Sequence, residues 1–417
     1  MNIQQSLRNN ILSLGGLQAF NFLLTLMVLP YLAHIFGAYG WGRAVFVQMI
    51  ANYLIWIVNW GFYWGSTKEV SKSRNNFLLR KQIFGVIWCA QWLLTVAAIF
   101  FLIIALLIFP VQLEDQYLYI ASIGLIVGGT LTPIWYYNGL EKIKEAAFLQ
   151  MLVKLLALPC IFFMVRNESD LIVYFVINSV SAILVGLISL AWLIVCGELE
   201  WYRPRVTEIK SAIFREFRWF KSSMVANLNG SLVPTFLGFL GGPTELGLYN
   251  LADRLRLAVV TALNPIIHAV FPRMSYLFAH SHKNALELLK KISLLIFGLS
   301  LCACLPLLFF PVDILGLLGG EDFEGAKTIL RWLAWTPIFS LAISFFLYQI
   351  LIPLDAAGEY NHVMTRTLIL TAILVYPLEY FWGGNGAAML VFLTELFAAG
   401  YLGLIIFKRK LLQNMDI

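Results

Sequence analysis

IFGVIWCAQWLLTVAAIFFLIIALLIF, residues 83–109, contains no charged side chain and is long enough to cross a bilayer as one helix. About 20 apolar residues in a helix span the roughly 30 Å of hydrocarbon in a membrane. Similar apolar runs recur throughout the 417 residues. We therefore expect an all-α polytopic membrane protein with twelve spans, at about 11–36, 43–65, 83–109, 117–137, 146–165, 172–196, 222–242, 250–279, 292–318, 328–350, 363–383 and 387–407.

The composition supports this interpretation and excludes several classes of function. Hydrophobic residues make up 60% of the chain, charged residues only 12%, and the mean hydropathy is +0.80. A soluble protein has about 25% charged residues. The net charge of +6 is interleaved between apolar runs, so we expect no nucleic-acid partner. The five cysteines lack metal-ligand spacing and no nucleotide or hydrolase motif is present, so we expect no metal, no cofactor and no catalytic residue.

The basic residues predict the orientation of the chain. Twenty of the 29 Lys and Arg residues fall in the tails and connections of one side. The opposite loops hold only Arg166 and Lys327, beside acidic patches such as Glu321–Asp322. By the positive-inside rule, both termini are expected to be cytoplasmic in a bacterial inner membrane.

A weak internal repeat indicates two six-helix lobes around a central cavity. Gly37 and Gly42 follow the first span as Gly242 and Gly247 follow the seventh, at the same spacing. We predict an N-terminal lobe at 1–200, a cytoplasmic amphipathic linker helix at 201–221, and a C-terminal lobe at 222–417. Two parallel repeats of this kind can give alternating access by rocking.

Lys154 lies in the middle of an apolar span, too deep for its ammonium group to reach the headgroups easily. A charge at the bilayer centre costs about 2.5–3.5 kcal/mol on insertion scales, so Lys154 is a candidate site residue. It contacts either an anionic substrate in a cavity or the carboxylate of a structural ion pair.

Two arginines occur close together in the eighth span. Arg254 and Arg256 are about 200° apart on a helix and cannot share a face. Asp253 is three residues before Arg256 and can pair with it. The two alternatives are a self-neutralised pair and an arginine that receives an anionic ligand.

Glu395 lies within the last span, where a carboxyl group is a candidate for coupling to a proton or sodium gradient, with Asp253 as a second candidate. An interhelical hydrogen bond is the alternative. Asn21 and Asn229 occupy corresponding places in the two repeats, either holding helices together or lining a cavity. The aromatic residues that end spans two and four, including Trp64 and Trp135 to Tyr137, are typical of membrane-interface belts, and stacking on a sugar is the alternative.

Two stretches carry a resemblance to a known family. The run LGGPTELGLYNLA at 240–252, with LNPI at 263–266 and FPRMS at 271–275, resembles the signature of O-antigen and capsule repeat-unit flippases of the Wzx type. PIWYYNGLEK at 133–142 is similar to the same family's fourth-span exit. This family belongs to the multidrug/oligosaccharidyl-lipid/polysaccharide (MOP) exporter superfamily.

The resemblance implies a transporter that flips an oligosaccharide repeat unit on undecaprenyl diphosphate from the cytoplasmic to the periplasmic leaflet. The family's basic positions would fall on Lys154 and Arg256 and its last-helix acid on Glu395, whereas Arg254 has no match. A polysaccharide polymerase and a chain-length regulator are the implied protein partners, within the surrounding membrane lipids.

Two rival functions are weighed against this one. A multidrug or metabolite cation antiporter of the same fold should have an acidic cavity, whereas the deep charge at Lys154 is basic. A polysaccharide polymerase or ligase would need a large outer loop, and the outer loops here are short. We therefore expect a flippase.

Overall fold

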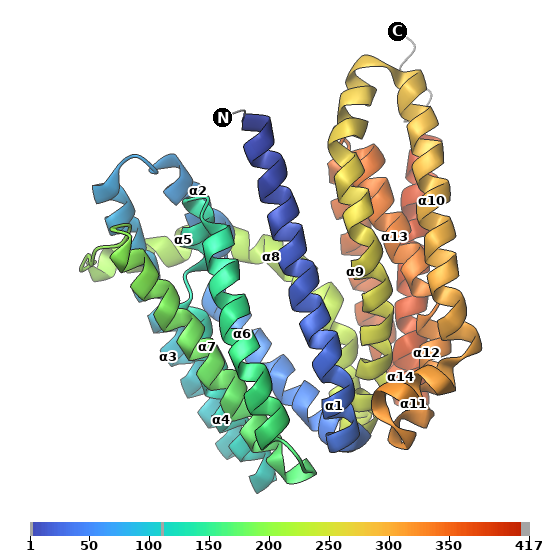
Figure 1. Ribbon diagram of the computed structural model, residues 1–417, viewed down its shortest axis with the longest axis horizontal. Helices are drawn as coiled ribbons and strands as arrows, with labels where there is room; N and C mark the ends of the chain where they lie inside the picture. The colour runs from blue at the N-terminus through green and yellow to red at the C-terminus, as the bar shows by residue number, and fades with distance from the viewer. Residues whose placement is uncertain (1–2, 110–111, 410–417) are drawn as a thin grey trace. The chain divides into compact units, whose positions relative to one another are not determined.

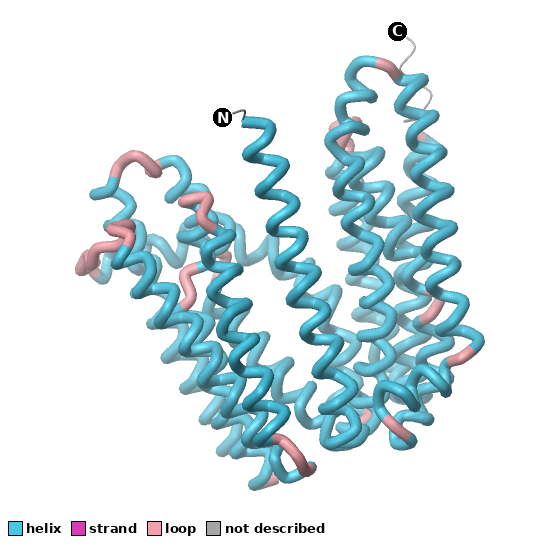
Figure 2. Tube along the Cα trace, viewed as in Figure 1, coloured by secondary structure: helices cyan, strands magenta, loops and turns pink. Residues whose placement is uncertain are grey.

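The computed structural model describes the backbone of residues 3–109 and 112–409, and the side chains from Met27 onward except 110, 111, 222, 225, 226 and those after 409. Every regular element in these ranges is a helix (Figure 2). The predicted all-α class is therefore confirmed. The chain divides into two compact units, residues 1–29 with 43–224 and residues 30–42 with 225–417.

Helices α1 to α7 follow in order, with one 3₁₀ turn: α1 Ile3–Asn59, α2 Phe62–Lys72, α3 Phe77–Ile108, α4 Leu113–Leu131, α5 Ile134–Gly139, α6 Ile143–Met164, η1 Glu168–Asp170 and α7 Leu171–Val195. The chain continues through α8 Val206–Leu240, α9 Gly242–His280, α10 His282–Phe309, α11 Pro311–Gly319, η2 Glu321–Ala326, α12 Lys327–Leu333, α13 Thr336–Phe346, the π-helical turn η3 Leu347–Leu351 and α14 Ala357–Lys408. Figure 1 labels most of them.

The two longest helices are each broken at one glycine. Gly37 in α1 has φ 59° and Gly383 in α14 has φ 51°, conformations that L side chains rarely adopt. Both breaks lie beside predicted span ends. Helix α14 contains two of the predicted spans, whereas α1 contains the first and most of the second, the end of which lies in α2.

Eight helices in the described ranges are long and apolar enough to cross a membrane. The pair Glu321–Leu333 and Thr336–Leu351, bent by 41°, would be a ninth. The chain is thus a multi-pass membrane protein. The count of twelve spans stays a prediction, because two of the eight are broken helices and α8 is not among them.

Helix α8 is continuous from Val206 to Leu240 and includes most of the predicted linker. Its first part packs on the first unit, where Trp60 stacks on Phe217 and Phe220 with ring centroids 5.6 and 4.4 Å apart. The indole of Trp60 also donates to the carbonyl of Ile213 at 3.0 Å. The predicted domain boundaries stay a prediction.

The core of the first unit corrects one expectation about the aromatic residues. Trp135, Tyr136 and Tyr137 are at most 2% exposed and pack in the core with Phe62 and Phe84, so they are not part of an interface belt. Their polar atoms are satisfied internally: the Tyr137 hydroxyl donates to the carbonyl of Ser189 at 2.7 Å. Trp64, by contrast, is 58% exposed, as an interface residue would be.

Candidate functional site

A cavity of about 280 Å³ lies within the second unit, between α8, α9, α13 and α14. It contains two carboxylates and one arginine, and we call it the acidic pocket. Its lining residues are Asn229, Gly230, Val233, Pro234, Tyr249, Asp253, Arg256, Ser340, Ile343, Tyr360, Met364, Thr367, Thr371, Val391, Thr394, Glu395 and Ala398.

Arg256 is the centre of the charges in the acidic pocket. Its Nε donates to Oδ1 of Asp253 at 2.6 Å, the i, i+3 pair that the helical spacing predicts. Its Nη1 lies 3.6 Å from Oε1 of Glu395, which reaches it from α14. The three side chains are only 12–24% exposed. Two carboxylates against one guanidinium leave a net negative charge when all three are ionised.

Arg254 is placed away from this pocket, as the 200° separation on the helix requires. Its Nε donates to Oδ1 of Asn250 at 3.0 Å, and its guanidinium lies 5.2 Å from the ring centroid of Trp41. Trp41 donates to the same Asn250 oxygen at 3.3 Å. Arg254 therefore attaches the turn of α1 to α9 and is not part of the acidic pocket.

Asn229 lines the acidic pocket, and its amide donates to the carbonyl of Met364 at 3.3 Å, linking α8 to α14. Asn21 belongs to α1, but its side chain is not among those that the structure describes.

Lys154 is exposed on α6 in the first unit, one residue after the buried Val153. Its neighbours Leu155 and Leu156 are 39% and 66% exposed. Of the carboxylates in the described part of the chain, none forms an ion pair with it within 4.0 Å. The structural ion pair that was the alternative for Lys154 is therefore not formed with any described carboxylate.

Sequence reasoning missed several polar residues that the fold gathers around Arg256. Thr367, Thr371 and Thr394 line the acidic pocket, and each hydroxyl bonds to the carbonyl four residues earlier in α14. The i, i+4 spacing of Thr367 and Thr371 in an apolar helix was the available signal. Tyr249 is 2% exposed and lies one turn before Asp253, on the same face of α9.

The stretch that carries the family resemblance has a packing role beside this pocket. A Cβ at Gly247 would overlap the carbonyl of Ala38, and one at Gly42 would overlap that of Pro243, so the backbones of α1 and α9 touch there. The N–H of Gly384 donates to Oε2 of Glu245 at 2.8 Å, beside the break in α14. These residues hold two helix breaks against the start of α9.

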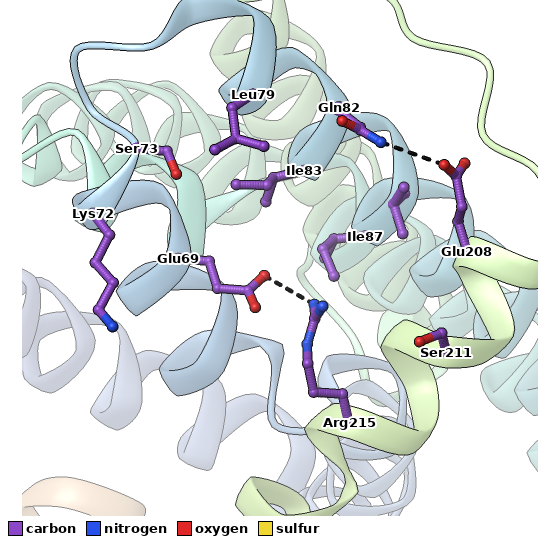
Figure 3. Close-up of a pocket in the computed structure, with 11 residues that line it drawn as sticks. Glu69, Lys72, Ser73, Leu79, Gln82, Ile83, Ile87, Glu208, Ser211 and Arg215 are labelled. Carbon is purple, nitrogen blue, oxygen red and sulfur yellow. Dashed lines mark hydrogen bonds and ion pairs between the residues drawn. The ribbon is translucent and has the colours of Figure 1, made fainter.

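A second cavity, of about 430 Å³, lies in the first unit between α2, α3 and the start of α8 (Figure 3). Two polar pairs cross it: Arg215 to Glu69 at 2.9 Å and Gln82 to Glu208 at 3.3 Å. The N–H of Arg205 donates to Glu208 at 2.7 Å, and this bond holds the pKa of Glu208 below its usual value. These polar pairs hold the amphipathic start of α8 against α2 and α3.

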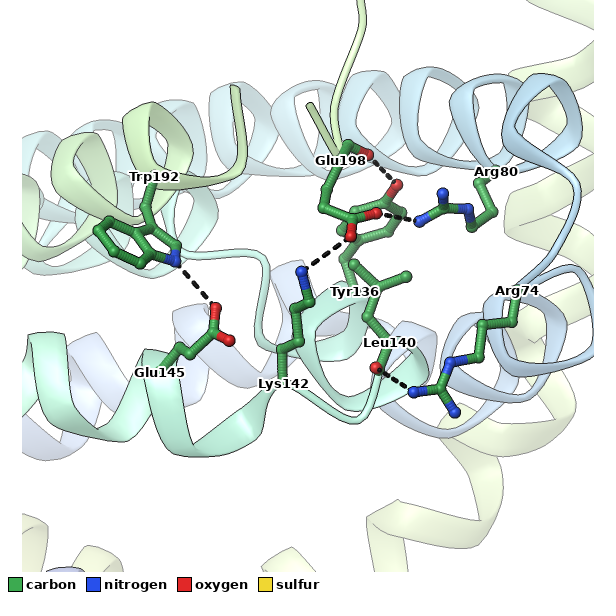
Figure 4. Close-up of polar contacts among 8 residues, drawn as sticks. All are labelled: Arg74, Arg80, Tyr136, Leu140, Lys142, Glu145, Trp192 and Glu198. Carbon is green, nitrogen blue, oxygen red and sulfur yellow. Dashed lines mark hydrogen bonds and ion pairs between the residues drawn. The ribbon is translucent and has the colours of Figure 1, made fainter. Parts of the chain in front are cut away.

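A cluster of ion pairs gathers around Glu198, after α7 (Figure 4). Glu198 accepts from Arg80 at 2.6 Å and from Lys142 at 2.8 Å, while its carbonyl accepts from the hydroxyl of Tyr136 at 2.6 Å. Burial alone would raise the pKa of Glu198, but the hydrogen bonds and charges of Lys142 and Arg80 outweigh it and lower the pKa. Three of the predicted cytoplasmic-side connections are joined here. No group of three or more His, Cys, Asp or Glu able to hold a metal occurs among the described residues.

The comparisons with known proteins agree with this architecture. A family described as "Polysaccharide biosynthesis protein" matches residues 7–278, well over half of the chain. The chain belongs to this family. Among the curated relatives of the chain is the "Putative O-antigen transporter" of Escherichia coli (strain K12), 26% identical over 416 residues and 98% of each chain. A protein of the same name from Shigella dysenteriae is 25% identical over 408 residues, 94% of this chain and 97% of that one.

Solved structures share the fold of this chain. Lipid II flippase MurJ, in an inward closed conformation, aligns with a TM-score of 0.73 and 15% identity over 94% of this chain and 86% of its own. An inward-facing MATE family multidrug resistance transporter of the MOP superfamily aligns with 0.69 and 12% over 94% and 96%. At these identities the likeness concerns the fold alone. The chain therefore has the fold that the resemblance implied, that of the MOP exporters.

Proposed function

We propose that the protein flips a lipid-linked oligosaccharide, a repeat unit on undecaprenyl diphosphate, from the cytoplasmic to the periplasmic leaflet by alternating access. The family supports a role in surface polysaccharide synthesis, and the names of the two curated relatives support transport of an O-antigen precursor. In this proposal both termini are cytoplasmic, and a polymerase and a chain-length regulator receive the flipped unit.

The observation that carries the proposal is the contrast between Lys154 and Arg256. Arg256 is already engaged by Asp253 and Glu395, whereas Lys154 has no ion-pair partner among the described carboxylates. A diphosphate is a strong anion that a lysine can bind as a point charge. Lys154 is therefore the better receptor for the headgroup, and it is expensive to keep in a span unless an anion visits it.

The acidic pocket suits the coupling step of the same cycle. A proton or a sodium ion arriving at Glu395 or Asp253 would neutralise the excess carboxylate and weaken its hold on Arg256. Release of Arg256 would break the ion pair that joins α9 to α14. The paired and released arrangements are two states of this link, and an ion that favours one of them biases the conformational equilibrium. The driving ion thus binds the second unit, while the diphosphate binds at Lys154.

Complementation of a deletion strain tests the flippase proposal. Deletion should abolish the surface polysaccharide and accumulate its lipid-linked precursor in the cytoplasmic leaflet. Lys154→Ala should fail to restore the polysaccharide and Lys154→Arg should restore part of it, because one charge-assisted bond changes affinity about ten- to a hundredfold. Lys327→Ala, at an exposed lysine after η2, is the matched control and should complement fully. Full activity of Lys154→Ala would remove this residue from the mechanism.

The net negative charge of the acidic pocket favours one alternative, a cation antiporter of the same fold. Proteoliposomes separate the two functions. A flippase coupled through Glu395 should move a fluorescent undecaprenyl-diphosphate oligosaccharide faster under an imposed proton or sodium gradient, and Glu395→Gln should lose that acceleration. Export of an organic cation such as ethidium, without any movement of the lipid, would favour the antiporter.

A further inference from the structure

A groove separate from the acidic pocket lies in the second unit, with a volume of about 490 Å³. It is bounded by α10, the end of α13, η3 and the last turns of α14, and we call it the α10–α14 groove. Its lining residues are Leu286, Leu289, Lys290, Ser293, Phe297, Phe345, Phe346, Ile350, Gly403, Ile406 and Phe407. None of them lines the acidic pocket.

The walls of the groove are almost entirely apolar. On α10 the lining positions recur every three or four residues from Leu286 to Phe297, which places them on one stripe about 16 Å long. Phe345 lies against Phe297, with ring centroids 6.1 Å apart, and forms part of the floor. Such a stripe follows the helix axis, so a hydrocarbon chain can lie along it.

Two local features of the backbone create the space. Gly403 has no side chain, and a Cβ there would first meet the ring of Phe346 at 3.8 Å, an ordinary contact distance. The turn η3 is π-helical, with the N–H of Ile352 donating to the carbonyl of Leu347 at 2.9 Å, and it places Ile350 in the floor. Single π-helical turns occur frequently at functional sites.

A single charged side chain, Lys290, lines the groove. Lys290 is exposed and forms no ion pair within 4.0 Å with the carboxylates of residues 27–109 and 112–409, including Glu287 one turn before it. Ser293 is one turn further into the groove, and its hydroxyl donates to the carbonyl of Lys290 at 2.9 Å. Lys291, in the first turns of α10, and Lys408, at the end of α14, add positive charge on the helices that bound the groove.

We propose that the α10–α14 groove binds an anionic phospholipid, with one acyl chain on the apolar stripe and the phosphate at Lys290. α10 and α14 both have the length and hydropathy of membrane spans, so lipid is the solvent of their outer faces. The unpaired lysine beside an apolar channel complements a molecule with an anionic head and a hydrocarbon tail. A groove of this volume holds one acyl chain, whereas the polyisoprenoid of a carrier lipid is several times longer.

Native mass spectrometry of the full chain tests this proposal. The purified protein is titrated with palmitoyl-oleoyl phosphatidylglycerol and, separately, with the phosphatidylcholine of the same chains. We expect one phosphatidylglycerol to be retained about tenfold more tightly than phosphatidylcholine, because the zwitterionic head largely cancels its own phosphate charge. Equal retention of the two lipids by the wild-type protein would overturn the proposal.

Three variants locate the binding. Gly403→Leu fills the groove and should weaken both lipids about tenfold, whereas Gly400→Leu, on the same helix with open space around it, should leave both unchanged. Lys290→Glu, at an exposed position, should remove only the preference for phosphatidylglycerol. A Gly403→Leu protein that retains phosphatidylglycerol like wild type, or a Lys290→Glu protein that keeps the preference, contradicts the assignment.

Undecaprenyl phosphate is the competitor that tests the identity of the occupant. At equal concentration it should not displace phosphatidylglycerol from the wild-type protein. Displacement that Gly403→Leu abolishes would assign the groove to the carrier lipid instead and reject the phospholipid. Each readout is a binding measurement, so the result does not depend on the flippase proposal.

Discussion

Replacing Glu198 by Gln should destabilise the first unit by about 2–4 kcal/mol. The substitution keeps the shape of the side chain but removes the charge that accepts from Arg80 and Lys142 at 2.6 and 2.8 Å. Hydrogen bonds to charged groups contribute about 1.5–3 kcal/mol each. The Arg80 side chain is only 10% exposed, so its bond keeps most of this value, whereas the 30% exposed Lys142 is partly screened.

The effect should depend on pH in a defined direction. The pKa of Glu198 lies below its usual value in the folded protein. Its contribution is therefore present above the unfolded pKa of about 4.3 and is lost as the pH falls through the folded pKa. The midpoint of the wild-type protein should fall towards that of Glu198→Gln as the medium is acidified.

Thermal unfolding in detergent, followed by intrinsic fluorescence from neutral pH downward, measures both effects. At neutral pH we expect the midpoint of Glu198→Gln to be roughly 5 °C or more below wild type. The matched control is Glu200→Gln on the same loop, which breaks the Lys81 pair where Glu200 is 58% exposed. That control should change stability by less than about 1 kcal/mol. Equal midpoints for wild type and Glu198→Gln at neutral pH would refute the reasoning.

Three further changes test other parts of the fold. Gly247→Ala should lower the free energy of unfolding by about 1–3 kcal/mol, since the new Cβ would overlap the backbone of Ala38. Gly298→Ala, in open space on α10, is the control and should be neutral or stabilising, and equal thermal midpoints for the two variants would contradict the close contact of α1 and α9. Burial raises the pKa of Glu216, whose side chain is 2% exposed, so its stabilising contribution is present below the unfolded pKa and is lost as the pH rises through the folded pKa. The thermal midpoint of wild type should therefore fall relative to that of Glu216→Gln as the pH is raised above the unfolded pKa of about 4.3, and parallel curves would reject this. Glu379 is 2% exposed, and neither of its carboxyl oxygens has a hydrogen-bond partner among the described residues. The thermal midpoint of Glu379→Gln should therefore be no lower than that of wild type, and a large drop in the midpoint would reveal a partner outside the described residues.

The sequence by itself determined the class of the protein. Apolar runs such as 83–109 are incompatible with water, and hydrocarbon accepts a backbone only as a helix or a closed barrel. The run 240–252, with the shorter matches beside it, was sufficient to indicate the fold that the solved structures share. That Asp253 can reach Arg256 and that Arg254 lies on another face followed from helical geometry alone, because both are local, whereas the choice between an ion pair and a bound ligand did not.

Only the tertiary structure decided what each long-range partner is. Glu395 and Arg256 are far apart in sequence, and the packing of α14 on α9 brings them to 3.6 Å. The burial of Trp135 to Tyr137 could not be inferred, because an aromatic run at a span end has the same pattern in a core as in an interface belt. The α10–α14 groove depends on a missing side chain at Gly403 and one widened turn after α13. Cavities of this kind have no sequence period, since they arise from packing between elements that the chain brings together only on folding.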